Sequence, residues 1–129
     1  MRLSLDTHAF LWSLNEDSQL PRTLVKALND SHNDVLVSAV VVWEIAVKLA
    51  AGKLAVPPNI GSWLPAELRR RHLQPLAIDF AHVCAVEHLP MHHRDPFDRL
   101  LIAQARVENL TIVSNDQKFP AYGLPLLWD

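Results

Sequence analysis

The sequence is poor in several features that would narrow its class. Its 129 residues include a single cysteine, Cys84, which leaves no partner for an internal disulfide and gives no sign of an oxidising compartment. No apolar run approaches the ~20 residues that span a bilayer, and the apolar stretch before Asp6 is too short for a signal peptide. We therefore expect a cytoplasmic protein with no membrane partner.

The chain also lacks an excess of charge of one sign. Its formal net charge is −2 with neutral histidines. A sequence-independent nucleic-acid coat is normally basic, so any nucleic-acid function must rest on a specific site. Half of the residues are hydrophobic and there is no low-complexity run. These features predict one compact domain over residues 1–129.

Short continuous apolar runs alternate with helical patterns along the chain. The runs predict strands, each buried on both faces, at 3–5, 35–37, 76–78 and 111–113, with a last edge strand within 124–128. Helices are expected at 8–14, 22–28, 39–51, 60–71, 80–88 and 97–108. Gly52 is expected to end the helix at 39–51, and Asp79 is expected to cap the helix at 80–88. This alternation predicts an α/β fold, a three-layer α/β/α sandwich with a mostly parallel central sheet.

Two acids follow predicted strands directly or closely. Asp6 comes after the first strand and Asp116 after the strand at 111–113. Ligands bind at the carboxyl ends of strands in open parallel sheets, which makes both acids candidate ligands. Each also has a structural explanation, because aspartate is a favoured helix cap and turn residue.

Two further acids lie in helices among apolar residues. Glu44 stands with Lys48 in an otherwise apolar helix, where an i,i+4 ion pair alone does little to explain a buried carboxylate. Asp98 projects onto the apolar stripe of its helix, whereas Arg99 projects onto a face that we expect to be solvated. Asp95 before Pro96 is interpreted as a helix cap, with a supporting ligand role left open.

Together the four acids suit a hard cation. Carboxylates without a dedicated cysteine or histidine set favour Mg²⁺ or Mn²⁺ over Zn²⁺. A bound ion of this kind activates water and holds a phosphate oxygen, which predicts phosphodiester hydrolysis. The adjacent pair His92 and His93 is interpreted as part of a surface loop rather than a transition-metal site. The predicted catalytic and metal-binding residues are Asp6, Glu44, Asp98 and Asp116.

Four segments, in order, resemble the PIN-domain family and most of all its VapC-type toxins. They are LDTH at 5–8, SAVVVWEIAVK at 38–48 with GKL at 52–54, HRDPFDR at 93–99 and SND at 114–116. The resemblance runs from residue 3 to about 128, and it aligns the same four acids with the family's acidic residues. Thr7 and Ser114 align with hydroxyls that support those acids.

The resemblance implies a Mg²⁺- or Mn²⁺-dependent endoribonuclease that acts on an RNA substrate as the toxin of a toxin–antitoxin pair. It also implies a homodimer and inhibition by a cognate antitoxin protein. Two alternatives stay open at this point. One is a non-catalytic PIN-like interaction module, in which the acids are caps and ion pairs, and the other is a phosphohydrolase of small phosphate esters.

Overall fold

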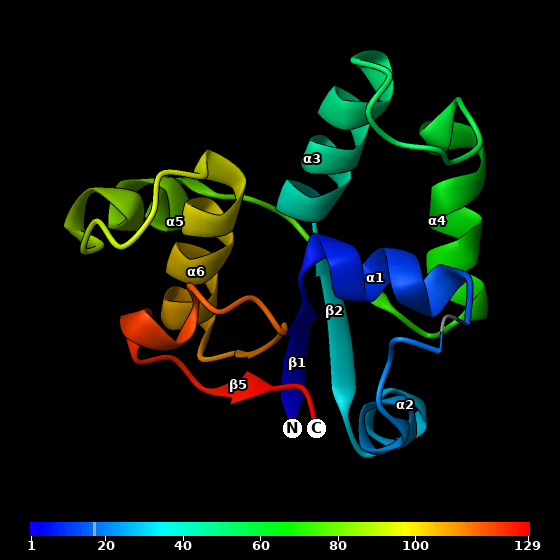
Figure 1. Ribbon diagram of the computed structural model, residues 1–129, viewed down its shortest axis with the longest axis horizontal. Helices are drawn as coiled ribbons and strands as arrows, with labels where there is room; N and C mark the ends of the chain where they lie inside the picture. Colours follow the sequence, from blue (N-terminus) through cyan, green and yellow to red (C-terminus); the bar gives the residue numbers. More distant parts are fainter. Residues whose placement is uncertain (17) are drawn as a thin grey trace.

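Five parallel strands form the central sheet of the computed structural model, which describes residues 1–16 and 18–129 (Figure 1). The spatial order is β3-β2-β1-β4-β5, so the first strand of the chain lies at the centre of the sheet. The strands are β1 (Arg2–Leu5), β2 (Asp34–Ser38), β3 (Gln74–Leu76), β4 (Thr111–Val113) and β5 (Leu126–Leu127). This arrangement confirms the predicted α/β class and the parallel sheet.

Helices cover both faces of the sheet. Figure 1 shows α5 and α6 on one side of the strands and α1, α2 and α4 on the other. Side chains alternate accordingly: Leu3 and Val35 pack into the cluster formed with α1 to α4, whereas Leu36 and Ile112 pack with α6. The helices are α1 (Thr7–Leu14), α2 (Arg22–Asn29), α3 (Ala39–Ala50), α4 (Ile60–Arg70), α5 (Phe80–Ala85) and α6 (Pro96–Glu108), with 3₁₀ turns at Val86–His88 and Pro120–Tyr122.

Two elements differ from the sequence prediction by more than one residue at an end. The strand expected at 76–78 lies at Gln74–Leu76, where Pro75 pairs with Val37 at the edge of the sheet. An edge strand tolerates proline because one side of its backbone needs no partner. The helix expected at 80–88 ends as an α-helix at Ala85 and continues as the 3₁₀ turn. Gly52 ends α3 as predicted, with φ of +70°.

The register of the central strands brings two chain segments to the same end of the sheet. Leu5 of β1 pairs with Val113 of β4, and the amide of Asp6 donates to the carbonyl of Val113 over 3.1 Å. The residues that follow these two strands therefore leave the sheet beside each other. Within the described residues, no helix combines the length and apolar character needed to cross a membrane.

Candidate metal and active site

Asp6 lies at the junction between β1 and α1. Its carboxylate caps the helix by accepting a hydrogen bond of 2.8 Å from the amide of Ala9. The side chain is buried, and this burial raises its pKa despite hydrogen bonds from Ser114 and Ala9 that act in the opposite direction. Asp6 is therefore both a cap, as its position predicts, and a carboxylate held at the carboxyl end of the central strand.

Asp116 follows the neighbouring strand. Its amide donates to Oγ of Ser114 over 3.0 Å, and its carboxylate accepts from the amide of Lys118 over 2.9 Å. The buried Ser114 also hydrogen-bonds the carboxylate of Asp6. The side chain of Ser114 thus lies beside both strand-end acids.

Glu44 lies in α3 with 5% of its surface exposed. Oε1 accepts a hydrogen bond of 2.6 Å from the hydroxyl of Thr7, and Oε2 lies 2.5 Å from Nζ of Lys48. The pair with Glu44 raises the pKa of Lys48, which keeps this amine charged. The predicted i,i+4 ion pair is therefore present, and Thr7 adds a second partner from another helix.

Asp98 lies in the first turn of α6. Asp95 caps this helix through a hydrogen bond of 3.0 Å from the amide of Asp98, and Pro96 occupies the first turn. The cap role interpreted for Asp95 is confirmed. On the same helix, the stripe predicted for the core is buried, including Leu101, Ile102 and Ala105.

The electrostatics of Asp98 show that the acids share one region. Burial raises its pKa to about 7, with further contributions from the negative charges of Asp95, Glu44, Asp116 and Asp6. Asp6, Glu44 and Asp116, which come from α3 and two strand ends, thus all lie within electrostatic range of Asp98. No three of these four acids, all lying in the described part of the chain, have ligand atoms within 4.8 Å of one another. This open spacing suits a cation that retains several of its own waters.

Two expectations for α6 and the loop before it were wrong. His93 is 8% exposed rather than part of a solvated loop, and only its neighbour His92 is exposed. Burial lowers the pKa of His93, whose Nδ1 lies 2.7 Å from the hydroxyl of Tyr122. Arg99 is also buried, because its guanidinium donates to the carbonyls of Leu89 and Pro90. Sequence reasoning missed both contacts, which depend on segments that cover this face of the helix.

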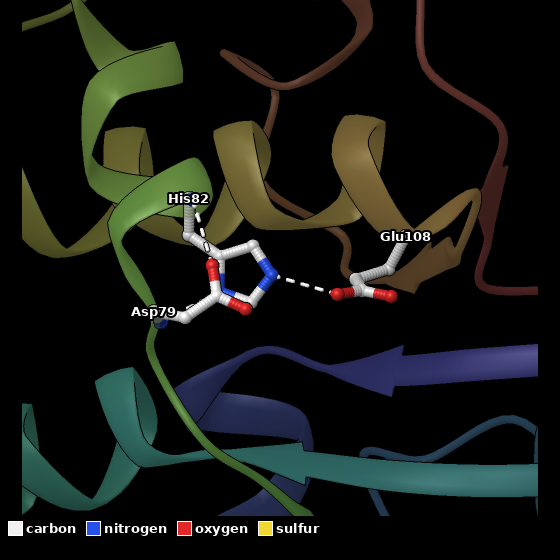
Figure 2. A group of neighbouring side chains, drawn as sticks. All are labelled: Asp79, His82 and Glu108. Atoms are coloured by element: carbon white, nitrogen blue, oxygen red, sulfur yellow. Dashed lines mark hydrogen bonds and ion pairs between the residues drawn. The ribbon is translucent and has the colours of Figure 1, made fainter.

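A different group does bring its ligand atoms within 4.8 Å of one another: Asp79, His82 and Glu108 (Figure 2). The donor set alone would suit a divalent ion, but both ring nitrogens of His82 already have partners. Nδ1 accepts a hydrogen bond of 3.1 Å from the amide of Asp79, and Nε2 lies 2.8 Å from Oε1 of Glu108. Asp79 in turn caps α5, as the sequence predicts. We interpret this group as a helix cap, built around the buried ring of His82, that fastens α5 to α6.

A cavity among the described residues lies away from the four acids. It has a volume of about 500 Å³ and is lined by residues of α1, α2 and α4 with the segments beside them, among them Leu20, Val25 and Arg71. None of the four acids lines it. The functional assignment therefore rests on the carboxylates and their strand-end placement rather than on cavity size.

Comparisons with known proteins agree with this geometry. The sequence matches the PIN domain family model over residues 3–124. It is 38% identical over 69 residues to Ribonuclease VapC16 of Mycobacterium tuberculosis (strain ATCC 25618 / H37Rv), a match covering 48% of this chain and 49% of that protein. The matched part thus spans about half the length of this curated relative.

Solved structures share the fold at low sequence identity. VapBC2 from Rickettsia felis, bound to a DNA fragment from its promoter, has a TM-score of 0.74 at 22% identity over 100% of both chains. DNA-bound VapBC from Salmonella typhimurium has a TM-score of 0.70 at 16% identity over 98% of this chain and 97% of that chain. FitAcB from Neisseria gonorrhoeae has a TM-score of 0.61 at 19% identity, covering 97% and 96%. Together with the family match over most of its length, these similarities establish that the chain belongs to the PIN domain family.

Proposed function

We propose that this chain is a Mg²⁺- or Mn²⁺-dependent endoribonuclease that cleaves RNA phosphodiesters with water, acting as the toxin of a toxin–antitoxin pair. One observation carries the proposal. Burial is the largest cause that raises the pKa of the Asp98 carboxyl to about 7, followed by the negative charges of the neighbouring acids, in the order Asp95, Glu44, Asp116 and Asp6. A group of acids held together at such an electrostatic cost is typical of a cation site.

The residues present fit a hard divalent cation. Asp6, Glu44, Asp98 and Asp116 offer carboxylate oxygens, the ligands that Mg²⁺ and Mn²⁺ prefer. When bound, such an ion supplies a water of lowered pKa and a positive charge for the phosphate. Its charge would also offset the repulsion recorded in the raised pKa of Asp98.

The chain's own residues hold the carboxylates in place. Thr7 occupies one oxygen of Glu44, and Ser114 hydrogen-bonds Asp6 while fixing the turn that carries Asp116. Lys48 adds a fixed positive charge beside Glu44. The side chain of Lys48 is 38% exposed, so it offers an electrostatic contact to an approaching RNA phosphate.

The substrate and partners follow from the family and its relatives. The curated relative is named a ribonuclease, and the similar structures are VapBC and FitAcB assemblies. We accordingly assign RNA as the substrate and a cognate antitoxin as the partner. A homodimer is also part of the proposal, and the exposed Trp43 and Val47 on α3 are apolar surface available to a protein contact.

Calorimetry with Mn²⁺ tests the metal site directly. Wild-type protein should release or absorb heat on binding, and Asp6→Asn should bind at least about tenfold more weakly because one buried ligand is neutralised. Asp30→Asn is the matched control, since Asp30 is an exposed acid outside the site. Absence of Mn²⁺-dependent heat in the wild type would favour the non-catalytic module and overturn the proposal.

Incubation with a mixed RNA pool tests the reaction. The wild type should degrade RNA in Mg²⁺ and stop when EDTA is added, whereas Asp6→Asn should be inactive or nearly so. Hydrolysis of small phosphate esters with no RNA cleavage would assign the phosphohydrolase function instead. Sedimentation of the purified chain, alone and with the antitoxin, tests the two assembly proposals.

A further inference from the structure

A buried chain of polar groups runs from α6 through the 3₁₀ turn at Pro120–Tyr122 to Asp98. Nη1 of Arg99 lies 3.3 Å from the hydroxyl oxygen of Tyr122. That hydroxyl lies 2.7 Å from Nδ1 of His93, and Nε2 of His93 lies 3.4 Å from Oδ2 of Asp98. The three residues Arg99, Tyr122 and His93 are all buried, so each polar atom needs a partner inside the protein.

The direction of these hydrogen bonds is inferred from the partners available to the hydroxyl of Tyr122. A guanidinium can only donate, so the oxygen of Tyr122 accepts from Arg99 and its own proton is free to be donated. Nδ1 of His93 is the acceptor that lies at hydrogen-bond distance. An accepting Nδ1 carries no proton, which places the proton of the neutral ring on Nε2.

Among the polar atoms linking Arg99, Tyr122 and His93, Nε2 of His93 is the one without a hydrogen-bond partner among the described residues. It is fully buried, although Oδ2 of Asp98 is 3.4 Å away. An unpaired buried N–H group costs about 1–3 kcal/mol, so it favours the nearest acceptor that can turn toward it. The side chain of Asp98 is 23% exposed and lies at the open end of this chain of groups.

We propose that His93, held as its Nε2–H tautomer by Tyr122 and Arg99, is a positioning residue for the carboxylate of Asp98. Its N–H directs Oδ2 of Asp98 and leaves the other oxygen for the cation. Aromatic contacts hold the ring itself, because His93 packs against Phe119 with centroids 6.1 Å apart and against Tyr122 at 5.4 Å. This inference rests on the metal site of the proposed function and adds a residue to it.

The tautomer is tested without any metal. Long-range ¹H–¹⁵N correlation spectra of the wild-type protein, assigned with a His93→Gln sample, should show Nε2 of His93 protonated and Nδ1 unprotonated. Tyr122→Phe removes the hydroxyl and should populate the other tautomer. A wild-type His93 protonated on Nδ1 would overturn the inference.

The positioning role is tested by Mn²⁺ calorimetry combined with urea unfolding. His93→Leu should weaken Mn²⁺ binding by about tenfold, the loss typical of a residue that supports a metal ligand. His93→Gln should restore part of it, because its amide can present an N–H near the position of Nε2. His92→Leu is the matched control: this neighbour is exposed and lies in a T-shaped contact with the ring of Tyr122, with centroids 4.7 Å apart.

Each combination of results gives a decision. Weakened binding by His93→Leu with recovery in His93→Gln supports the role, provided that both variants unfold cooperatively. If His93→Leu fails to fold, Tyr122→Phe takes its place and should weaken binding by roughly threefold. Wild-type affinity in folded His93→Leu, or in folded Tyr122→Phe when it is the substitute, overturns the inference and leaves the proposed function intact. Absence of binding in the wild type overturns the proposed function, while the tautomer spectra still decide whether the polar chain exists.

Discussion

The hydroxyl of Thr7 donates a hydrogen bond of 2.6 Å to Oε1 of Glu44, joining the first turn of α1 to the middle of α3. Both residues are buried. Because α1 begins directly after β1, this bond ties the carboxylate of Glu44 to the carboxyl end of the central strand. Glu44 therefore cannot move independently of Asp6, the residue before Thr7.

Removing the Thr7 hydroxyl should loosen this connection. Thr7→Val keeps the shape of the side chain but leaves Oε1 of Glu44 without its donor, which should lower the free energy of unfolding by about 1–2 kcal/mol. The affinity for Mn²⁺ should fall by roughly three- to tenfold because the carboxylate is less well oriented. Urea unfolding and calorimetry measure the two effects. Thr7→Ser retains a hydroxyl and should stay close to the wild type; equal losses in both variants would contradict the role of the bond.

The ionisation of Asp98 predicts how stability depends on pH in the absence of metal. Burial and the neighbouring acids raise its pKa to about 7 in the folded protein, from an ordinary value of 3.8. The folded state therefore keeps a proton that the unfolded state has lost, and stability falls as pH rises from about 4 to about 7. Asp98→Asn resembles the protonated form at every pH. At pH 8 in EDTA this variant should be more stable than the wild type by on the order of 1–3 kcal/mol.

Urea unfolding at pH 5.5 and pH 8 measures this effect. Asp30→Asn is the control, because hydrogen bonds from His32 lower the pKa of Asp30 and keep it ionised at both pH values. Added Mn²⁺ should stabilise the wild type at pH 8 and have less effect on Asp98→Asn. If the free energy of unfolding changes with pH in the same way for the wild type and Asp98→Asn, the pKa of Asp98 is not raised in the folded protein.

The two possible roles of Asp95 can be separated by a pair of substitutions. Asp95→Ser retains a cap for the amide of Asp98 but removes the carboxylate, whereas Asp95→Ala removes both. If Asp95 only caps α6, the serine variant should keep the wild-type Mn²⁺ affinity and the alanine variant should lose about 1 kcal/mol of stability. Calorimetry and urea unfolding report these outcomes. A matching loss of affinity in both variants would instead identify the carboxylate of Asp95 as a ligand.

The sequence predicted those parts of the molecule that follow from local pattern. Short apolar runs indicated the buried parallel strands, and the positions of Asp6 and Asp116 after two of them followed from the chain order. Pro75 obscured the third strand, since proline in a strand is tolerated only where one side of the backbone is free. Helix starts at Asp79 and Asp95 were predicted because capping is a local interaction.

Contacts between distant segments could not be predicted in this way. A helical projection of α6 treats the helix as isolated, so it assigned Arg99 to solvent without the loop that carries Leu89 and Pro90. His93 and Tyr122 are 29 positions apart, and nothing local pairs them. The bond between Thr7 and Glu44 likewise depends on how α1 and α3 cross. The four acids and the hydroxyls of Thr7 and Ser114 were proposed from the sequence, whereas the contacts among His93, Tyr122 and Arg99 required the structure.

The cluster of Asp79, His82 and Glu108 provides a test of whether a second metal site exists. His82 is 1% exposed and bonded through both ring nitrogens, so we expect it to stabilise the packing of α5 on α6 rather than to bind a cation. His82→Ala should lower the free energy of unfolding by about 2–3 kcal/mol through the lost cap and the unpaired Glu108. The Mn²⁺ affinity and stoichiometry of the folded variant should be unchanged. Glu108→Gln serves as the milder control, since it keeps an oxygen acceptor for Nε2 of His82, and its loss of stability should be smaller. A drop in the number of bound ions in either variant would show that the group in Figure 2 is a metal site after all.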